Sequence, residues 1–272
     1  MTRLDLSWSA RPASLSLSET DVHLWYTPLD QSSTVVERFQ HLLSNEERQR
    51  AERFYFAQDY EHFIVGRGML RVLLGSYLRV PPAALKFQYG QYGKPVLVQP
   101  NTAEQLTFNV SHSQNLALYA IACNREVGVD VEYMRSLADA PGIAAQFFSP
   151  EERNALQALP EPQYQQGFYS CWTRKEAYIK ALGKGLLQPL ETFTVPLTSD
   201  RNDQPLPIRN EQEDCSRWYL YDIPPPPLFP DYKAALVVER TQRHLYNILS
   251  WQQPGEEGTL CSSVKERKER LL

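Results

Sequence analysis

Two short acidic segments contain the residues whose types and spacing could do chemistry. In the first, Gly128–Glu132, the acidic residues Asp130 and Glu132 alternate with Val129 and Val131. A period of two is typical of a β-strand, so we expect both carboxylates on one face of it. Two carboxylates side by side can share a hard cation such as Mg²⁺, which takes oxygen ligands.

The second segment, Trp172–Gly185, adds a third carboxylate and several lysines. Its spacing is helical, which places Glu176 and Lys180, four residues apart, on neighbouring turns. Mg²⁺ usually keeps phosphate oxygens and water in its shell. Three carboxylates with adjacent lysines therefore suggest a site for Mg²⁺ and a phosphate-bearing substrate.

The elements that must position these residues recur along the chain. Ser44-Asn45-Glu46-Glu47 predicts a capping box at a helix start, and Ser149-Pro150-Glu151-Glu152 repeats it 105 residues later. A long helix is expected further on in each half, over residues 60–78 and through 172–182. Short strands are predicted near 22–26, 87–89, 95–98, 108–111 and 116–122, and again near 128–132, 193–195, 218–223 and 233–238.

These matching series predict an α+β fold of two similar halves related by pseudo-twofold symmetry, each a small antiparallel sheet packed with helices. We place the boundary in a linker near Asn124–Glu126, which gives an N-terminal half, 1–125, and a C-terminal half, 126–272. A site containing Asp130 then lies near the junction, where ligand sites are common. Coincidence stays open as an alternative, because the capping motif is a common one.

Composition narrows the class of protein. The 272 residues, 42% hydrophobic and 22% charged, fit one large or two moderate globular domains. A formal net charge of −4 argues against a nucleic-acid binder. No apolar run is long enough to span a membrane, and no secretion signal is visible. Four scattered cysteines without a C-x-x-C pair favour reduced thiols in a cytoplasmic protein.

Taken in order, the motifs resemble those of one enzyme family. They are Tyr92–Pro95, Phe108–Ser113, Gly128–Glu132, Phe148–Glu152, Trp172–Lys180 and Gly183–Gly185. Their order and approximate spacing are similar to those of the 4′-phosphopantetheinyl transferases, specifically the two-half, surfactin-synthetase-activating type. The resemblance covers most of the chain, from about Leu24 to Val238.

The resemblance implies transfer of the phosphopantetheine arm of coenzyme A to a serine of an apo acyl or peptidyl carrier protein, with release of adenosine 3′,5′-bisphosphate. Asp130, Glu132 and Glu176 would hold Mg²⁺, or Mn²⁺ as a substitute, against the pyrophosphate. Glu176 would also be the general base, with Glu152 as the alternative base. Lys180 would contact the phosphates as a point charge.

The same resemblance implies contacts to the nucleotide end of coenzyme A. His112 would bind the 3′-phosphate, beside Ser111. The chain departs from some relatives at Glu47, where they have a basic residue, so the other basic residues gain importance. The implied set of contacts is Arg50, Arg67, Lys94, Pro95, Ser111, His112, Lys175 and Lys180.

Two other functions stay open on the residues alone. One is a Mg²⁺-dependent pyrophosphohydrolase or nucleotidyl transferase, although neither an E-x-x-E-E cluster nor a G-x-x-x-x-G-K-[ST] loop is present. The other is a non-catalytic protein that binds coenzyme A or a carrier, which would have no need of a metal trio. Both sides of the expected site lie in one chain, so we expect a monomer that needs neither nucleic acid nor membrane.

Overall fold

The computed structural model describes residues 8–10, 15–90, 93–99, 105–183, 188–198, 204–210, 214–240 and 247–252. Tyr92, Lys184 and Gly185 of the motifs above therefore lie outside the described residues. Within the described part of the chain, no helix is long and apolar enough to cross a membrane.

The first half builds one sheet and a cluster of helices. After β1 (Trp8–Ala10), the elements are β2 (Asp21–Pro28), α1 (Ser33–Gln40), α2 (Asn45–Ala51), α3 (Ala57–Leu78), the 3₁₀ turn η1 (Pro82–Ala84), β3 (Phe87–Tyr89), β4 (Pro95–Leu97), β5 (Leu106–Ser113) and β6 (Leu116–Cys123). Antiparallel pairing joins β2 to β6 and β6 to β5. A separate hairpin pairs β3 with β4.

The second half repeats this plan with a smaller sheet. It contains β7 (Val127–Tyr133), α4 (Ala140–Phe147), α5 (Pro150–Gln157), α6 (Glu161–Leu182), the 3₁₀ turn η3 (Leu190–Thr192), β8 (Phe193–Thr194), β9 (Arg209–Asn210), the 3₁₀ turn η4 (Cys215–Arg217), β10 (Trp218–Ile223) and β11 (Tyr232–Glu239). The three main strands pair antiparallel in the order β10-β11-β7. The last strand, β12 (Asn247–Gln252), instead pairs parallel with β2 and β1 in the first half's sheet.

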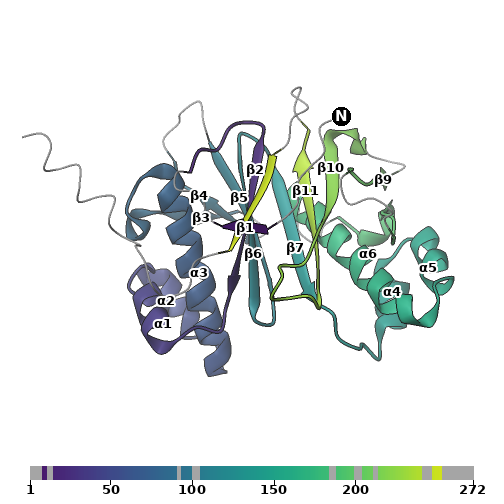
Figure 1. Cartoon of the computed structure of the whole chain (residues 1–272), viewed down its shortest axis with the longest axis horizontal. Helices are drawn as coiled ribbons and strands as arrows, with labels where there is room; N and C mark the ends of the chain where they lie inside the picture. Colours follow the sequence, from purple (N-terminus) through teal and green to yellow (C-terminus); the bar gives the residue numbers. More distant parts are fainter. Residues whose placement is uncertain are drawn as a thin grey trace, which may run out of the picture.

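The two sheets pack face to face, and helices cover their outer faces (Figure 1). The alternation of side chains along each strand explains these layers. On β6, Ala117, Tyr119 and Ile121 belong to the core with α3, whereas Leu116 and Leu118 belong to the core between the sheets. On β11, residues 235 and 237 pack toward α6, while 234, 236 and 238 face the other sheet.

The predicted fold class is confirmed, with differences in the details. The long helix of the second half begins at Glu161, earlier than predicted, because Pro160 and Pro162 are tolerated at a helix start. Helices α1 and α4 were not expected. The first half's sheet is not purely antiparallel, because β12, from the second half, joins it in parallel with β2.

Candidate active site at the junction of the two halves

The two acidic residues of β7 face helix α6. A Cβ built on Gly128 would lie 2.1 Å from the carbonyl oxygen of Ala177 and 2.3 Å from the nitrogen of Ala181, so α6 packs directly on the strand at this glycine. Asp130 and Glu132 follow on the same face of β7 as Gly128, because side chains alternate along a strand. The missing Cβ therefore brings α6 close to both carboxylates.

Strand β5 supplies hydroxyl groups to the carboxylates from the other half. Ser111 Oγ donates to Asp130 Oδ1 at 2.8 Å, and Ser113 Oγ donates to Glu132 Oε2 at 2.7 Å. The Asn109 side chain accepts a hydrogen bond from the Val129 backbone N–H at 2.9 Å. Sequence reasoning missed Asn109 and Ser113 as site residues, although their period-two spacing with Ser111 was a readable signal.

Asp130 lies at the centre of the site and is almost completely buried. Lys180 Nζ of α6 lies 2.6 Å from its Oδ1 and 2.9 Å from Ser111 Oγ. The second carboxylate oxygen, Oδ2, is buried without a hydrogen-bond partner among the described residues. A buried acceptor left unpaired is costly, so this atom points to a ligand.

Three carboxylates are close enough to affect one another. Burial raises the pKa of Glu176 to about 7, the negative charges of Asp130 and Glu132 also raise it, and Lys180 opposes the rise. Burial, followed by the charge of Asp130, likewise raises the pKa of Glu132, while Ser113, Lys180 and the Trp172 side chain act in the opposite direction. A carboxyl group with a pKa near 7 in such a cluster is a candidate for proton transfer.

The donor set fits a hard cation. It offers three carboxylates that repel one another and one buried oxygen without a partner, and a divalent ion would relieve both conditions. However, no three His, Cys, Asp or Glu side chains in the described part of the chain are grouped closely enough to hold a metal ion as they stand. Metal binding would therefore require the carboxylate side chains to move closer together.

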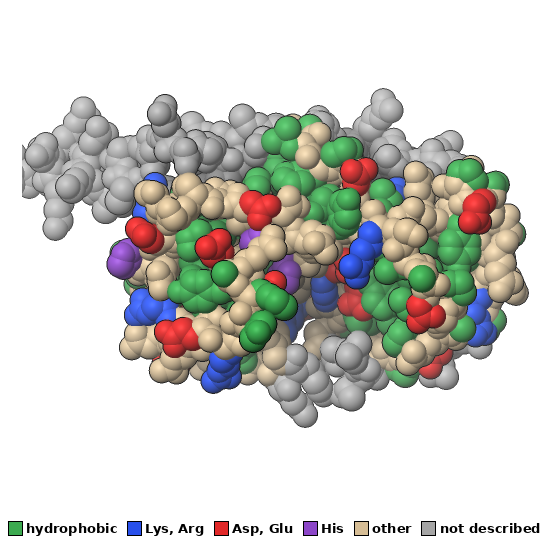
Figure 2. All heavy atoms as spheres, turned by 90° about the horizontal axis from the view of Figure 1, so that it is seen from below, with side chains coloured by type: hydrophobic (Ala, Val, Ile, Leu, Met, Phe, Trp, Pro, Cys, Tyr) green, Lys and Arg blue, Asp and Glu red, His purple; other side chains and the backbone are tan. Residues whose placement is uncertain are grey.

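The hairpin of β3 and β4 reaches across from the first half. Lys94 Nζ, just before Pro95 of β4, donates to the carbonyl oxygen of Lys180 at 3.1 Å and lies 3.4 Å from Glu126 Oε2. The predicted contact residue Lys94 is thus beside the helix that carries Lys180. Figure 2, which views the molecule from below, shows a hollow between the two lobes with charged side chains on its walls.

His112 follows Ser111 on β5, and its side chain is exposed. Its pKa is lowered, first by loss of hydration where the protein surrounds it, and then by the charges of Lys180 and His62. Asp130 acts in the opposite direction. His112 therefore lies near the carboxylate site and near His62 of α3, a residue that sequence reasoning missed.

The two predicted arginine contacts lie around Tyr89 at the end of β3. The exposed Arg50 has its guanidinium carbon 5.9 Å from the centre of the Tyr89 ring and 5.6 Å from that of Phe63. Arg67 donates from Nη2 to the Tyr89 hydroxyl at 3.3 Å, and its guanidinium carbon lies 4.0 Å from the centre of the Phe87 ring. Tyr89 is half exposed between these two arginines, and it was not among the residues predicted to contact coenzyme A.

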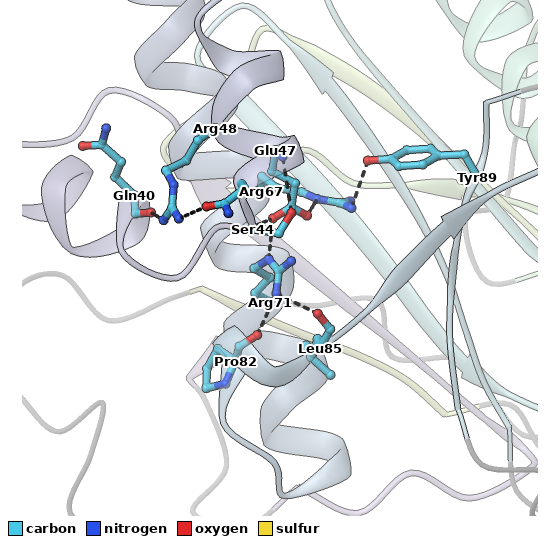
Figure 3. A network of polar contacts seen from close by, with 10 residues as sticks. Gln40, Ser44, Glu47, Arg48, Arg67, Arg71, Pro82, Leu85 and Tyr89 are labelled. Carbon is cyan, nitrogen blue, oxygen red and sulfur yellow. Dashed lines mark hydrogen bonds and ion pairs between the residues drawn. The ribbon is translucent and has the colours of Figure 1, made fainter.

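Glu47 neutralises part of this positive charge (Figure 3). Its two oxygens accept hydrogen bonds from Arg67 Nε at 2.5 Å and Arg71 Nε at 2.7 Å, and both arginines come from α3. Arg71 also donates to the carbonyl oxygens of Pro82 and Leu85. Because Arg67 is buried against Glu47, Arg50 is the more accessible of the two predicted arginine contacts.

The structure does not bring Glu152 and Lys175 to the carboxylate site. Lys175 Nζ is fully buried, lies 2.8 Å from Glu152 Oε2, and donates to the carbonyl oxygens of Leu190 and Phe193. The other Glu152 oxygen accepts from the Val195 backbone N–H at 2.7 Å. Both carboxylate oxygens of Glu152 are therefore occupied in the core, and the Lys175 ammonium group already has three partners there. In this arrangement Glu152 is not positioned to act as a base, and Lys175 is not positioned to contact a phosphate.

Comparison with protein families agrees with this arrangement. The family described as the 4′-phosphopantetheinyl transferase superfamily matches residues 126–237. The family described as 4′-phosphopantetheinyl transferase, N-terminal, matches residues 27–124. The two matches correspond to the two lobes, and the match over residues 126–237 contains the three carboxylates and Lys180.

Individual relatives cover most of the same region. The chain is 44% identical over 195 residues to the 4′-phosphopantetheinyl transferase HetI of Nostoc sp., covering 72% of this chain and 82% of that protein. It is 32% identical over 173 residues to Sfp of Bacillus subtilis, covering 64% and 74% of the two chains. It is 31% identical over 195 residues to the 4′-phosphopantetheinyl transferase gsp of Aneurinibacillus migulanus, covering 71% of this chain and 75% of that protein. The chain therefore belongs to the two-domain, Sfp-type 4′-phosphopantetheinyl transferases, enzymes that transfer the phosphopantetheine group of coenzyme A to carrier proteins.

Proposed function

We propose that the site around Asp130 carries out this transfer, with a Mg²⁺ ion held by Asp130, Glu132 and Glu176. The observation that supports it best is the buried Asp130 Oδ2, which lacks a partner among the described residues and lies in a cluster of mutually repelling carboxylates. When bound, the ion would neutralise charge on the pyrophosphate of coenzyme A and polarise the phosphorus under attack.

Glu176 takes the proton of the carrier serine, directly or through water. Its pKa near 7 lets the carboxylate form be populated at neutral pH while the group stays basic enough to accept a proton. The serine oxygen forms a bond to the phosphorus that carries the pantetheine arm. The bond from this phosphorus to the bridging oxygen breaks, and adenosine 3′,5′-bisphosphate leaves.

Lys180 stabilises the negative charge that gathers on the phosphate oxygens. Its ammonium group lies 2.6 Å from Asp130 Oδ1, within the site, and its side chain remains partly exposed. It can therefore exchange a carboxylate partner for a phosphate without a change in the fold. Since a lysine acts as a point charge, a phosphate oxygen is a suitable partner.

The first half holds the nucleotide end of coenzyme A. Lys94 and Pro95 approach from the β3–β4 hairpin, His112 and Ser111 from β5, and the exposed Arg50 from α2. Arg67 has a more indirect part, because Glu47 and Tyr89 already bind its guanidinium. Both walls of the site come from one chain, so the active form is proposed to be a monomer.

The carrier substrates are proposed to be apo acyl or peptidyl carrier proteins of fatty-acid, polyketide or nonribosomal-peptide synthesis. The test is incubation of the protein with coenzyme A, Mg²⁺ and a panel of apo carriers, followed by mass spectrometry of the carriers. We expect a gain of one phosphopantetheine group, lost when EDTA replaces Mg²⁺. Cleavage of coenzyme A without any modified carrier would instead favour the pyrophosphohydrolase.

A further inference from the structure

The face of β5 that carries His112 points toward helix α3. Phe108 is part of the core that contains Ile64 and Val65 of α3, and Val110 packs against the same core. His112 is the next residue of this period-two series. Its pairing partner on β6, Ala117, also belongs to the α3 core. His112 therefore lies on the face of the sheet that packs against α3, at the end where its side chain becomes exposed.

His62 lies on α3 at the same end of the sheet. The Tyr119 hydroxyl donates to the carbonyl oxygen of Gly66, which is one helical turn after His62. His62 Nε2 lies 2.7 Å from Asp30 Oδ1, and Asp30 follows β2 at the end where the β5–β6 turn begins. The charge of His62 is among those that lower the pKa of His112. The two histidines therefore approach each other from α3 and β5.

Asp30 fixes how His62 can act. The hydrogen bond with His62 is the largest cause that lowers the pKa of Asp30, so the aspartate stays ionised as the partner of His62 Nε2. With Nε2 directed at Asp30, Nδ1 is the nitrogen from which a protonated ring can donate to a second anion. The ring has little freedom to turn away, because the His62 side chain is only 14% exposed.

Two cationic side chains lie near the two histidines, and Asp130 is the carboxylate that acts on His112. Arg50 lies over Phe63, the residue that follows His62, and Lys180 is close enough to lower the pKa of His112. Glu47 does not cancel them, because both of its oxygens are bound by Arg67 and Arg71. A doubly charged anion bound here would thus have two histidines and two cationic side chains near it, and Asp30 is already paired with His62.

We infer that His62, oriented by Asp30, binds the 3′-phosphate of coenzyme A together with His112. This inference rests on the proposed function, because it assigns a residue to the nucleotide end of the same substrate. It also gives the chain a further contact to this phosphate, where some relatives have a basic residue at the position of Glu47. His62 acts on binding of the phosphomonoester and not on the pyrophosphate that reacts.

The experiment compares coenzyme A with 3′-dephospho-coenzyme A, which lacks only the phosphate in question. For His62→Gln we expect kcat/KM for coenzyme A to fall about tenfold, mostly through KM, as loss of one charge-assisted hydrogen bond predicts. With 3′-dephospho-coenzyme A, kcat/KM should remain within about twofold of the native enzyme. His41→Gln, a change of an exposed histidine at the end of α1, is the matched control and should alter neither.

Each outcome decides the assignment. Equal losses with both substrates, or no loss with either, would overturn it. If His62→Gln does not fold, Asp30→Asn replaces it, with a smaller loss that is again confined to coenzyme A; no such loss would count against the inference. Calorimetry with adenosine 3′,5′-bisphosphate and adenosine 5′-phosphate separates this question from catalysis. A native preference for the bisphosphate that His62→Gln removes would support the inference even if no carrier were modified.

Discussion

Arg71 and Lys175 make equivalent contacts in the two halves of the molecule. Helices α3 and α6 both have 22 residues, and aligning the two helices from their first residues matches Arg71 with Lys175. Each binds the glutamate of a capping box, Glu47 or Glu152, and each donates to two main-chain carbonyl oxygens in or beside a 3₁₀ turn. The pair therefore ties the long helix, the capping box and the following chain together in each half, and a duplication explains this match better than coincidence.

Lys175→Met is expected to destabilise the fold without weakening the binding of coenzyme A. It leaves the Glu152 carboxylate buried without its cation, which costs about 3–5 kcal/mol. Urea denaturation should show this loss, and the double variant Glu152→Gln/Lys175→Met should recover part of it. The folded fraction should keep its KM for coenzyme A. A stable Lys175→Met protein with a raised KM would restore Lys175 as a substrate contact.

Asp130→Asn is expected to abolish the response to Mg²⁺. The amide presents a nitrogen or a single neutral oxygen where the carboxylate offers an unpaired charged oxygen, so metal affinity falls. Transfer should drop about 100-fold or more, since the metal contributes several kcal/mol to the reaction. Thermal unfolding with and without Mg²⁺ provides a second readout, in which only the native protein should be stabilised. Stabilisation of both proteins by Mg²⁺ would place the metal elsewhere.

Glu176 should make the stability of the metal-free protein depend on pH. Its pKa is raised to about 7 in the folded state, so the folded protein holds a proton that the unfolded chain has already released above about 4.5. This contribution favours folding below pH 4.5 and is lost as the pH rises through 7. In EDTA at pH 8, Glu176→Gln should therefore be more stable than the native protein by about 1–2 kcal/mol.

The same variant should be nearly inactive in transfer, because glutamine cannot accept the serine proton. Urea denaturation at pH 4.5 and pH 8 supplies the control, since the gain in stability should be absent at the lower pH. A gain that is equal at both pH values would mean that packing, and not ionisation, sets the effect.

Arg50→Gln should raise the KM for coenzyme A with little change in kcat. The guanidinium is exposed beside Tyr89, so we expect a rise of about fivefold at low salt that shrinks as the ionic strength increases. Arg38→Gln, an exposed change on α1, is the control for loss of a surface charge. Equal effects of the two variants would indicate a general field effect instead of a contact.

Gly128→Ala should damage both stability and catalysis. The new methyl group would collide with the backbone of α6 at 2.1 Å, so the helix that carries Glu176 and Lys180 must move away from β7. A lower Tm together with a lower kcat is expected. Gly66→Ala in α3 is the matched control, because its Cβ would meet its nearest neighbour at an ordinary 3.6 Å. An unchanged kcat in Gly128→Ala would mean that the reaction does not depend on the close packing of α6 against β7.

Local patterns in the sequence were sufficient for the two-lobed fold and for the chemical types in the site. The period-two carboxylates of β7, the helical pair Glu176 and Lys180, and the repeated capping boxes are short-range features that neighbouring residues decide. These features could be predicted from the sequence because each depends only on the spacing of residues along one helix or strand. The alternation of Asn109, Ser111 and Ser113 is equally local and could have indicated which side chains of β5 face β7, but of the three only Ser111 was predicted.

Only the tertiary structure decided which charged residues meet. Glu152 and Lys175 lie in motifs beside the site residues, yet the packing of α5 against α6 turns them into the core, whereas Glu176, next to Lys175, faces β7. The approach of His62 to His112 depends on how α3 crosses the sheet, and the return of β12 depends on a strand edge in the other half. Such contacts join residues far apart in the chain, so burial and packing fix them, and no local pattern can.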